Sequence, residues 1–158
     1  MYNQKICSFH VSDLHLFTIV LPYINEKIKE EKDIVTISQK DLSLEVKKYL
    51  KNVKSFKCER EKILNIGWRR VKEEQFNKDF SNKIVIVIGN NNFVDEVNKF
   101  LDTKVDIFEI VNCYNIENGN QIADIIQRYD MLLNTEGKFR IEKNSQNAQK
   151  RKTIKSQL

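Results

Sequence analysis

The stretch that decides the fold is Lys83-Ile84-Val85-Ile86-Val87-Ile88-Gly89-Asn90-Asn91-Asn92. Its run of β-branched isoleucine and valine favours a strand, and a continuously apolar strand needs cover on both faces of a sheet. The glycine and asparagines that follow predict a turn. Apolar residues spaced by three and four from Phe93 to Leu101 then predict a helix. This strand–turn–helix unit is typical of a parallel α/β sheet.

The same alternation extends from this unit towards both ends of the chain. Further strands are predicted at residues 5–11, 34–38, 105–114 and, shortest of all, 138–141, with a weaker candidate at 53–58. Strands that alternate with helices in this way indicate right-handed crossovers and a parallel sheet. We therefore expect a three-layer α/β sandwich with a mostly parallel sheet of about five strands.

Three more helices are predicted between these strands, at residues 13–31, 42–50 and 119–133. Ser12 is the expected N-cap of the first of them and Asp41 of the second. Pro22 lies inside the first pattern and is expected to kink or divide that helix. Residues 59–80 are the least regular segment, because Gly67 interrupts a loosely helical spacing.

Composition predicts one domain at residues 1–142 and a separate basic tail at 143–158. A chain of 158 residues with 41% apolar content can bury one core. The longest apolar run, residues 16–22, is too short to span a membrane, so no membrane contact is expected. Three cysteines, an odd number, do not form a disulfide framework. This favours a reducing, cytoplasmic location.

The positive charge belongs to the tail. The net charge is +5, and five of the 27 basic residues lie in 143–158 without an acidic one, so residues 1–142 carry 22 of each sign. Such a tail is usually a disordered, solubilising end. The alternative is a nucleic-acid-associated protein that contacts phosphates through counterion release. The residues that would do so are Arg69, Arg70, Lys150, Arg151 and Lys152.

The chain lacks the motifs that would identify an enzyme or a bound cofactor. The turn at Gly89 has neither the lysine nor the hydroxyl of a phosphate loop, and no GxGxxG fingerprint is present. Ser12-Asp13-Leu14-His15-Leu16 resembles the opening of calcineurin-like metallophosphoesterases, in which Asp13 and His15 would hold a metal. With only two histidines in the chain, a dinuclear centre lacks ligands. We expect no catalytic residue, no metal and no cofactor. A metallophosphoesterase-like enzyme is the least favoured alternative hypothesis.

Cysteines lie in the two strands that end at the expected functional edge. Cys7 belongs to Ile6-Cys7-Ser8-Phe9-His10 and Cys113 to Ile110-Val111-Asn112-Cys113-Tyr114. Ligands of open parallel sheets bind beyond the carboxyl ends of strands. Two interpretations stay open: the thiols, with Cys58, are small buried hydrophobes, or Cys7 and Cys113 meet across adjacent strands as a soft patch.

The same two strands resemble the methanogen/methylotroph sensory (MEDS) domain family. The opening strand with its long helix to Leu21-Pro22-Tyr23-Ile24, and Cys113-Tyr114 followed by a polar loop and an apolar helix, are similar to that family's motifs over roughly residues 5–135. The resemblance implies a fold like that of RecA-type ATPases without the phosphate-binding loop. It also implies a sensory or regulatory role rather than catalysis.

Taken onto this sequence, the resemblance places a ligand pocket at Cys7, Phe9, Cys113 and Tyr114. The partners it implies are a small organic ligand, of unknown identity, or a signalling protein. Two interpretations of Trp68, beside Arg69 and Arg70, are open: a stacking or anionic contact, or an amphipathic helix whose apolar face is buried through this tryptophan.

Overall fold

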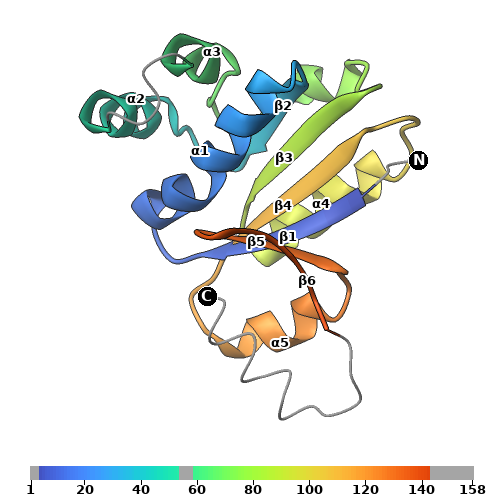
Figure 1. The fold of residues 1–158 in the computed structure, drawn as a ribbon. Helices are drawn as coiled ribbons and strands as arrows, with labels where there is room; N and C mark the ends of the chain where they lie inside the picture. Colours follow the sequence, from blue (N-terminus) through green and yellow to red (C-terminus); the bar gives the residue numbers. More distant parts are fainter. Residues whose placement is uncertain (1–3, 54–58, 143–158) are drawn as a thin grey trace.

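The computed structural model describes residues 4–53 and 59–142 (Figure 1). The six strands are β1 (Gln4–His10), β2 (Asp33–Ser38), β3 (Lys83–Gly89), β4 (Glu109–Asn115), β5 (Met131–Asn134) and β6 (Gly137–Arg140). The α-helices are α1 (Asp13–Lys29), α2 (Ser43–Asn52), α3 (Arg60–Asn65), α4 (Asn91–Leu101) and α5 (Asn120–Ile126), and Glu73–Asn77 forms a 3₁₀ helix. The basic tail and Cys58 lie outside the described residues.

The six strands form one sheet in the order β2-β3-β4-β1-β5-β6. All neighbours are parallel except β5 and β6, which pair antiparallel. Helices α1, α2 and α3 cover one face, and α4 and α5 cover the other (Figure 1). The three-layer α/β sandwich predicted from the sequence is thus confirmed, with the unpredicted strand β5 bringing the described sheet to six strands rather than about five.

Strands β1 and β4 lie side by side, but the helices that follow them leave on opposite faces of the sheet. Helix α1 follows β1 on one face, and α5 follows β4 on the other (Figure 1). Such a switch point is where open α/β sheets bind ligands. The prediction that these two strands run in the same direction as neighbours is confirmed.

Helix α1 forms where its capping signal predicts. The Ser12 side chain accepts a hydrogen bond from the His15 backbone N–H at 3.1 Å, which satisfies one of the free amides of the first turn. The helix continues undivided through Pro22. Pro22 is exposed, so the carbonyl that loses its intrahelical partner can turn to water. Leu14 belongs to the apolar pattern of this helix but is 63% exposed.

The predicted helix at 119–133 is wrong in its last part. Helix α5 ends at Ile126, and Met131–Asn134 forms β5, which pairs with β1 at Ile6 and Cys7. A segment as short as these four residues is locally compatible with either a helix or a strand. The free edge of β1 decides in favour of a strand, because it offers backbone hydrogen-bond partners. The short strand expected at 138–141 is confirmed as β6, whereas the weak candidate at 53–58 falls almost wholly outside the described residues.

Gly67 and Trp68 organise the segment after α3. Gly67 has φ of +92°, a conformation that favours glycine, and its carbonyl accepts a hydrogen bond from the Thr36 hydroxyl at 2.5 Å. Trp68 is 2% exposed and donates its indole N–H to the Ile63 carbonyl at 2.9 Å. The predicted burial of the tryptophan is therefore confirmed over a stacking contact. Trp68 does not lie on a helix as expected, however, since α3 ends at Asn65.

Among residues 4–53 and 59–142, no helix combines the length and apolar character that crossing a membrane requires.

Candidate ligand-binding site

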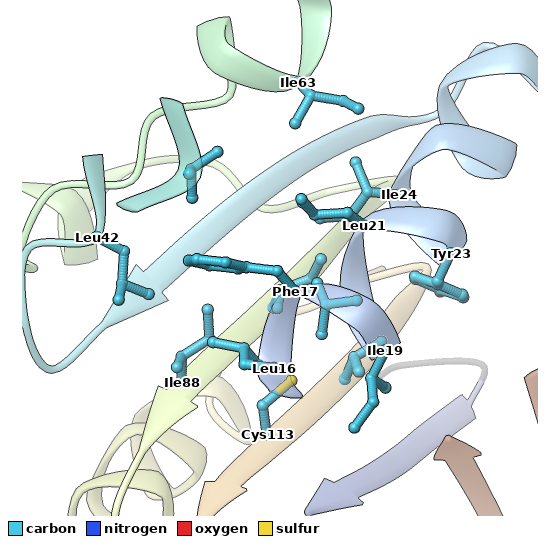
Figure 2. Packing of buried hydrophobic residues seen from close by; sticks show 14 of the residues in the cluster. Leu16, Phe17, Ile19, Leu21, Tyr23, Ile24, Leu42, Ile63, Ile88 and Cys113 are labelled. Carbon is cyan, nitrogen blue, oxygen red and sulfur yellow. The ribbon is translucent and has the colours of Figure 1, made fainter. Parts of the chain in front are cut away.

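The structure brings together three of the four predicted ligand-binding residues. Cys7, Phe9 and Tyr114 all lie on the sheet face covered by α4 and α5. Phe9 and Tyr114 are register partners on β1 and β4, and their rings stack with centroids 5.6 Å apart. Cys113 points the other way, into the core beneath α1, where it lies with Leu16 and Ile88 (Figure 2).

The two thiols do not meet, so the predicted soft patch is wrong. Cys7 is the register partner of Asn112, and Cys113 that of Ser8. Neighbours along a strand point to opposite faces, so this register separates the two sulfur atoms. Burial raises the pKa of Cys7 to about 12, and burial with the nearby Cys7 raises the pKa of Cys113 as well. Both remain protonated, buried thiols at neutral pH.

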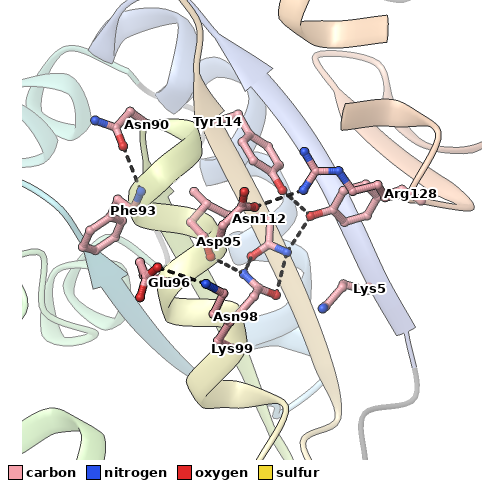
Figure 3. Close-up of polar contacts among 12 residues, drawn as sticks. Lys5, Asn90, Phe93, Asp95, Glu96, Asn98, Lys99, Asn112, Tyr114 and Arg128 are labelled. Carbon is pink, nitrogen blue, oxygen red and sulfur yellow. Dashed lines mark hydrogen bonds and ion pairs between the residues drawn. The ribbon is translucent and has the colours of Figure 1, made fainter. Parts of the chain in front are cut away.

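A chain of buried polar side chains joins α4 to β4 and to the loop after α5 (Figure 3). Asn98 Nδ2 donates to Asn112 Oδ1 at 2.8 Å, and Asn112 Nδ2 donates back to Asn98 Oδ1 at 3.0 Å. Asn112 Nδ2 also donates to the Tyr129 hydroxyl at 2.9 Å. The Tyr129 and Tyr114 hydroxyls lie 2.5 Å apart. We call Asn98, Asn112, Tyr114 and Tyr129 the Asn–Tyr network.

The network opens into a cleft of about 350 Å³ between α4 and the loop that follows α5, here called the α4/α5 cleft. Asn98, Tyr114 and Tyr129 form its polar inner wall. Its rim is charged, and Arg128 Nη1 lies 3.1 Å from Asp95 Oδ1 across it (Figure 3). The charged residues that line the cleft are Lys5, Asp95, Lys99, Asp102 and Arg128.

Burial keeps the two phenols of the cleft in their neutral form. It raises the pKa of Tyr114 to about 12, against a lowering contribution from the hydrogen bond with Tyr129. The pKa of Tyr129 is also raised, by burial first and by the neighbouring Tyr114 second. At neutral pH each hydroxyl therefore carries its hydrogen and can act as a hydrogen-bond donor, but neither is suited to proton transfer.

The carboxyl edge of the sheet, where the pocket was expected, uses many of its polar groups internally. The Asn90 side chain caps α4 by accepting from the Phe93 N–H at 2.9 Å, and Gln39 Oε1 accepts from the Asn90 N–H at 2.9 Å. The α4 turn thus offers a phosphate fewer free amides than an open helix start.

The residues that resemble a metallophosphoesterase opening are also in use within the protein. Asp13 pairs with Lys40 at 2.8 Å, and His15 Nδ1 accepts the Val11 N–H at 3.2 Å. Within the described ranges no group of three or more histidine, cysteine, aspartate or glutamate side chains is placed to hold a metal ion. The arrangement around Asp13 and His15 serves to hold the start of α1.

Of the residues proposed for nucleic-acid contact, the structure describes only two. Arg69 and Arg70 are exposed, and Arg70 forms an isolated bridge with Ser38, the last residue of β2. Lys150, Arg151 and Lys152 lie outside the described residues.

Sequence reasoning missed most of the Asn–Tyr network and Arg128. Tyr129 falls within the predicted helix 119–133 and was not predicted as a site residue. Asn112 carried a signal, because it is the one polar residue in the apolar run 110–113. Asn98 carried another, because it follows Val94 by four residues on the buried side of α4. Arg128 gave no local signal, since its position depends on where α5 ends.

Comparisons with protein-family models, with curated proteins and with solved structures found no significant match. The resemblance to the MEDS domain family therefore stays a prediction.

Proposed function

We propose that this protein is a non-catalytic sensory or regulatory domain of the cytoplasm, which binds a small organic molecule in the α4/α5 cleft and signals through a partner protein. The observation that carries the proposal is the Asn–Tyr network, a buried and hydrogen-bonded polar wall that ends in an open cleft. Apolar side chains would cover the sheet at less desolvation cost. A polar wall of this kind is what a site needs to orient a ligand.

The dimensions and position of the cleft agree with this role. A volume of about 350 Å³ lies within the range of small-molecule sites. The cleft is bounded by α4 on one side and by the loop from α5 to β5 on the other. A molecule that contacts both walls fixes their separation, and its binding energy then favours one arrangement of the two elements. Such a change on the surface is what a partner protein can read.

Binding, rather than catalysis, is favoured by the state of the candidate reactive groups. The thiols of Cys7 and Cys113 are fully buried with raised pKa, and the phenols of Tyr114 and Tyr129 also have raised pKa. Nucleophiles and general acids or bases need pKa values close to the working pH. These side chains can donate hydrogen bonds but are poorly poised for a reaction.

The proposal is tested by titrating ¹⁵N-labelled protein with a mixture of small polar metabolites and following backbone amide shifts. We expect the shifts to gather at Asn98, Tyr114 and Arg128. Tyr114→Phe removes one hydroxyl and should weaken binding by about tenfold, the usual effect of losing a hydrogen bond to a ligand.

Tyr49→Phe is the matched control, because Tyr49 is a half-buried tyrosine packed on the opposite face of the sheet. It should bind as the unmodified protein does. If no compound shifts the cleft residues, or if the shifts gather between α1 and α2 instead, the proposed site is wrong.

A further inference from the structure

The Asn–Tyr network has one more hydrogen to donate than it can use internally. Asn98 Nδ2 donates its two hydrogens to the Val94 carbonyl and to Asn112 Oδ1. Asn112 Nδ2 donates its two hydrogens to Asn98 Oδ1 and to the Tyr129 hydroxyl. Only the contact between the Tyr129 and Tyr114 hydroxyls remains, and it takes a single hydrogen.

Each phenol, however, carries a hydrogen of its own. If Tyr129 donates to Tyr114, the Tyr114 hydrogen is left over, and if Tyr114 donates, the Tyr129 hydrogen is left over. Either way one hydroxyl hydrogen finds no acceptor in the network. Both phenols line the α4/α5 cleft, so this hydrogen is available to whatever enters it. The cleft thus requires a hydrogen-bond acceptor from its occupant.

The rim beside the phenols supplies positive charge. Arg128 and Asp95 both lie close enough to Tyr114 to influence its hydroxyl electrostatically, and Figure 3 shows the guanidinium beside that ring. The Arg128 guanidinium has five N–H donors, of which one is engaged within residues 4–53 and 59–142, with Asp95 at 3.1 Å. Its side chain is 47% exposed. The donors that remain suit a planar, two-oxygen acceptor.

The overall charge of the lining selects among such acceptors. Three basic and two acidic side chains line the cleft, which leaves one net positive charge. A single negative charge is balanced by this lining, whereas a phosphate dianion would face Asp95 and Asp102 without full compensation. A spare hydroxyl hydrogen, a guanidinium and one net positive charge together match the hydrogen-bonding groups and the charge of a monocarboxylate.

We propose that the α4/α5 cleft binds a small organic monocarboxylate, whose carboxylate accepts the spare hydrogen of the Tyr114–Tyr129 pair and pairs with Arg128. This inference rests on the proposed function and names the chemical class of its ligand.

The test compares carboxylates with their uncharged amides. Acetate, butyrate and benzoate, and the matching acetamide, butyramide and benzamide, are titrated at constant ionic strength up to about 20 mM, a range suited to fragments of millimolar affinity. Binding is followed by the backbone amide shifts of Asn98, Tyr114 and Arg128. We expect at least one acid to bind about tenfold more tightly than its amide, as charge-assisted hydrogen bonds are the stronger ones.

Two variants of one ion pair separate recognition from structure. Arg128→Gln and Asp95→Asn both break the same contact, so a purely structural effect would be similar in both. We expect Arg128→Gln to lose the preference for acids, about tenfold. Asp95→Asn should bind acids as tightly or more tightly, because it removes the anion that competes for the guanidinium.

The outcomes separate the two proposals. If uncharged compounds shift the cleft residues while acids bind no better than amides, the carboxylate assignment is wrong and the site stands. Equal losses in the two variants also overturn the assignment. If neither these probes nor the metabolite mixture shifts the cleft residues, both proposals fail, and the spare hydroxyl hydrogen serves an ordered water only.

Discussion

The two faces of the sheet are covered by side chains of different chemical character. The face beneath α1, α2 and α3 is covered by aliphatic and aromatic side chains, among them Leu16, Phe17 and Ile24 (Figure 2). The face beneath α4 and α5 has an apolar cluster too, but the Asn–Tyr network crosses it (Figure 3). Apolar contacts stabilise a fold without selecting a ligand, whereas directional polar groups do both. On our proposal, the face beneath α1, α2 and α3 chiefly stabilises the domain, and the face beneath α4 and α5 also binds the ligand.

The largest expected effect tests the stabilising role of the α1 face. Phe17 is 2% exposed and packs against Tyr49 and Trp68. Phe17→Ala should lower the free energy of unfolding by about 3–5 kcal/mol, since it removes a buried ring and leaves a cavity. Urea denaturation measures the change. Leu14→Ala, on the same helix but 63% exposed, should change it by less than about 0.5 kcal/mol.

A loss below about 1 kcal/mol in Phe17→Ala would mean that the α1 face can collapse around the missing ring. The assignment of stability to that face would then be wrong.

The second effect tests whether the Asn–Tyr network acts as a unit. Asn112→Ala removes three hydrogen bonds and strands the buried Asn98 amide, which should cost about 2–3 kcal/mol of unfolding free energy. Adding Asn98→Ala should cost about 1 kcal/mol less than it does alone, because its partner is already gone. Asn92→Ala, exposed on the same helix, is the control. Additive losses in the double variant would contradict a coupled network.

These two regions also show what can be read from the sequence. Strands β1 to β4 and β6, with helices α1 and α4, were predictable because apolar period and capping are local properties, as in Ser12 and the run 84–88. Strand β5 was not, because it forms by pairing with β1. The opposite placement of Cys7 and Cys113 was not, since it depends on the register of β1 against β4. The Asn98–Asn112 pair depends likewise on how α4 docks. Of the predicted site, Tyr114 alone lines the described cleft.

The third effect concerns an exception to the apolar character of the α1 face. Ser8 Oγ and His10 Nδ1 are buried there, and neither has a hydrogen-bond partner in the described part of the chain. Burial lowers the pKa of His10 to about 4, helped by the nearby His15 and Lys40 and opposed by Asp13. The folded protein therefore resists protonation of His10, while the unfolded chain accepts a proton near pH 6.5.

Stability contributed by neutral His10 is thus present above pH 6.5 and is lost as the pH falls towards 4. Between pH 7.5 and pH 5 the unmodified protein should lose about 2 kcal/mol more than His10→Gln does. Urea denaturation at both values measures this difference. Because both proteins contain Glu109, whose pKa burial raises, its opposite contribution cancels in the comparison. Equal losses in the two proteins would show that His10 is not held neutral.

The smallest expected change in stability is the sharpest test of the comparison. The pair of Arg128 and Asp95 is 47% and 39% exposed, so solvent screens it and Arg128→Gln should lower the free energy of unfolding by less than about 0.5 kcal/mol. If the α4/α5 cleft recognises a carboxylate, the same substitution should cost about tenfold in affinity. Thermal denaturation with and without benzoate measures both, since a ligand that binds only the folded state raises the melting temperature. Benzoate should stabilise the unmodified protein more than Arg128→Gln, although the two melt alike without it. If Arg128→Gln lowers the melting temperature without benzoate, Arg128 instead stabilises the face beneath α4 and α5. The proposed difference in role between the two faces would then be wrong.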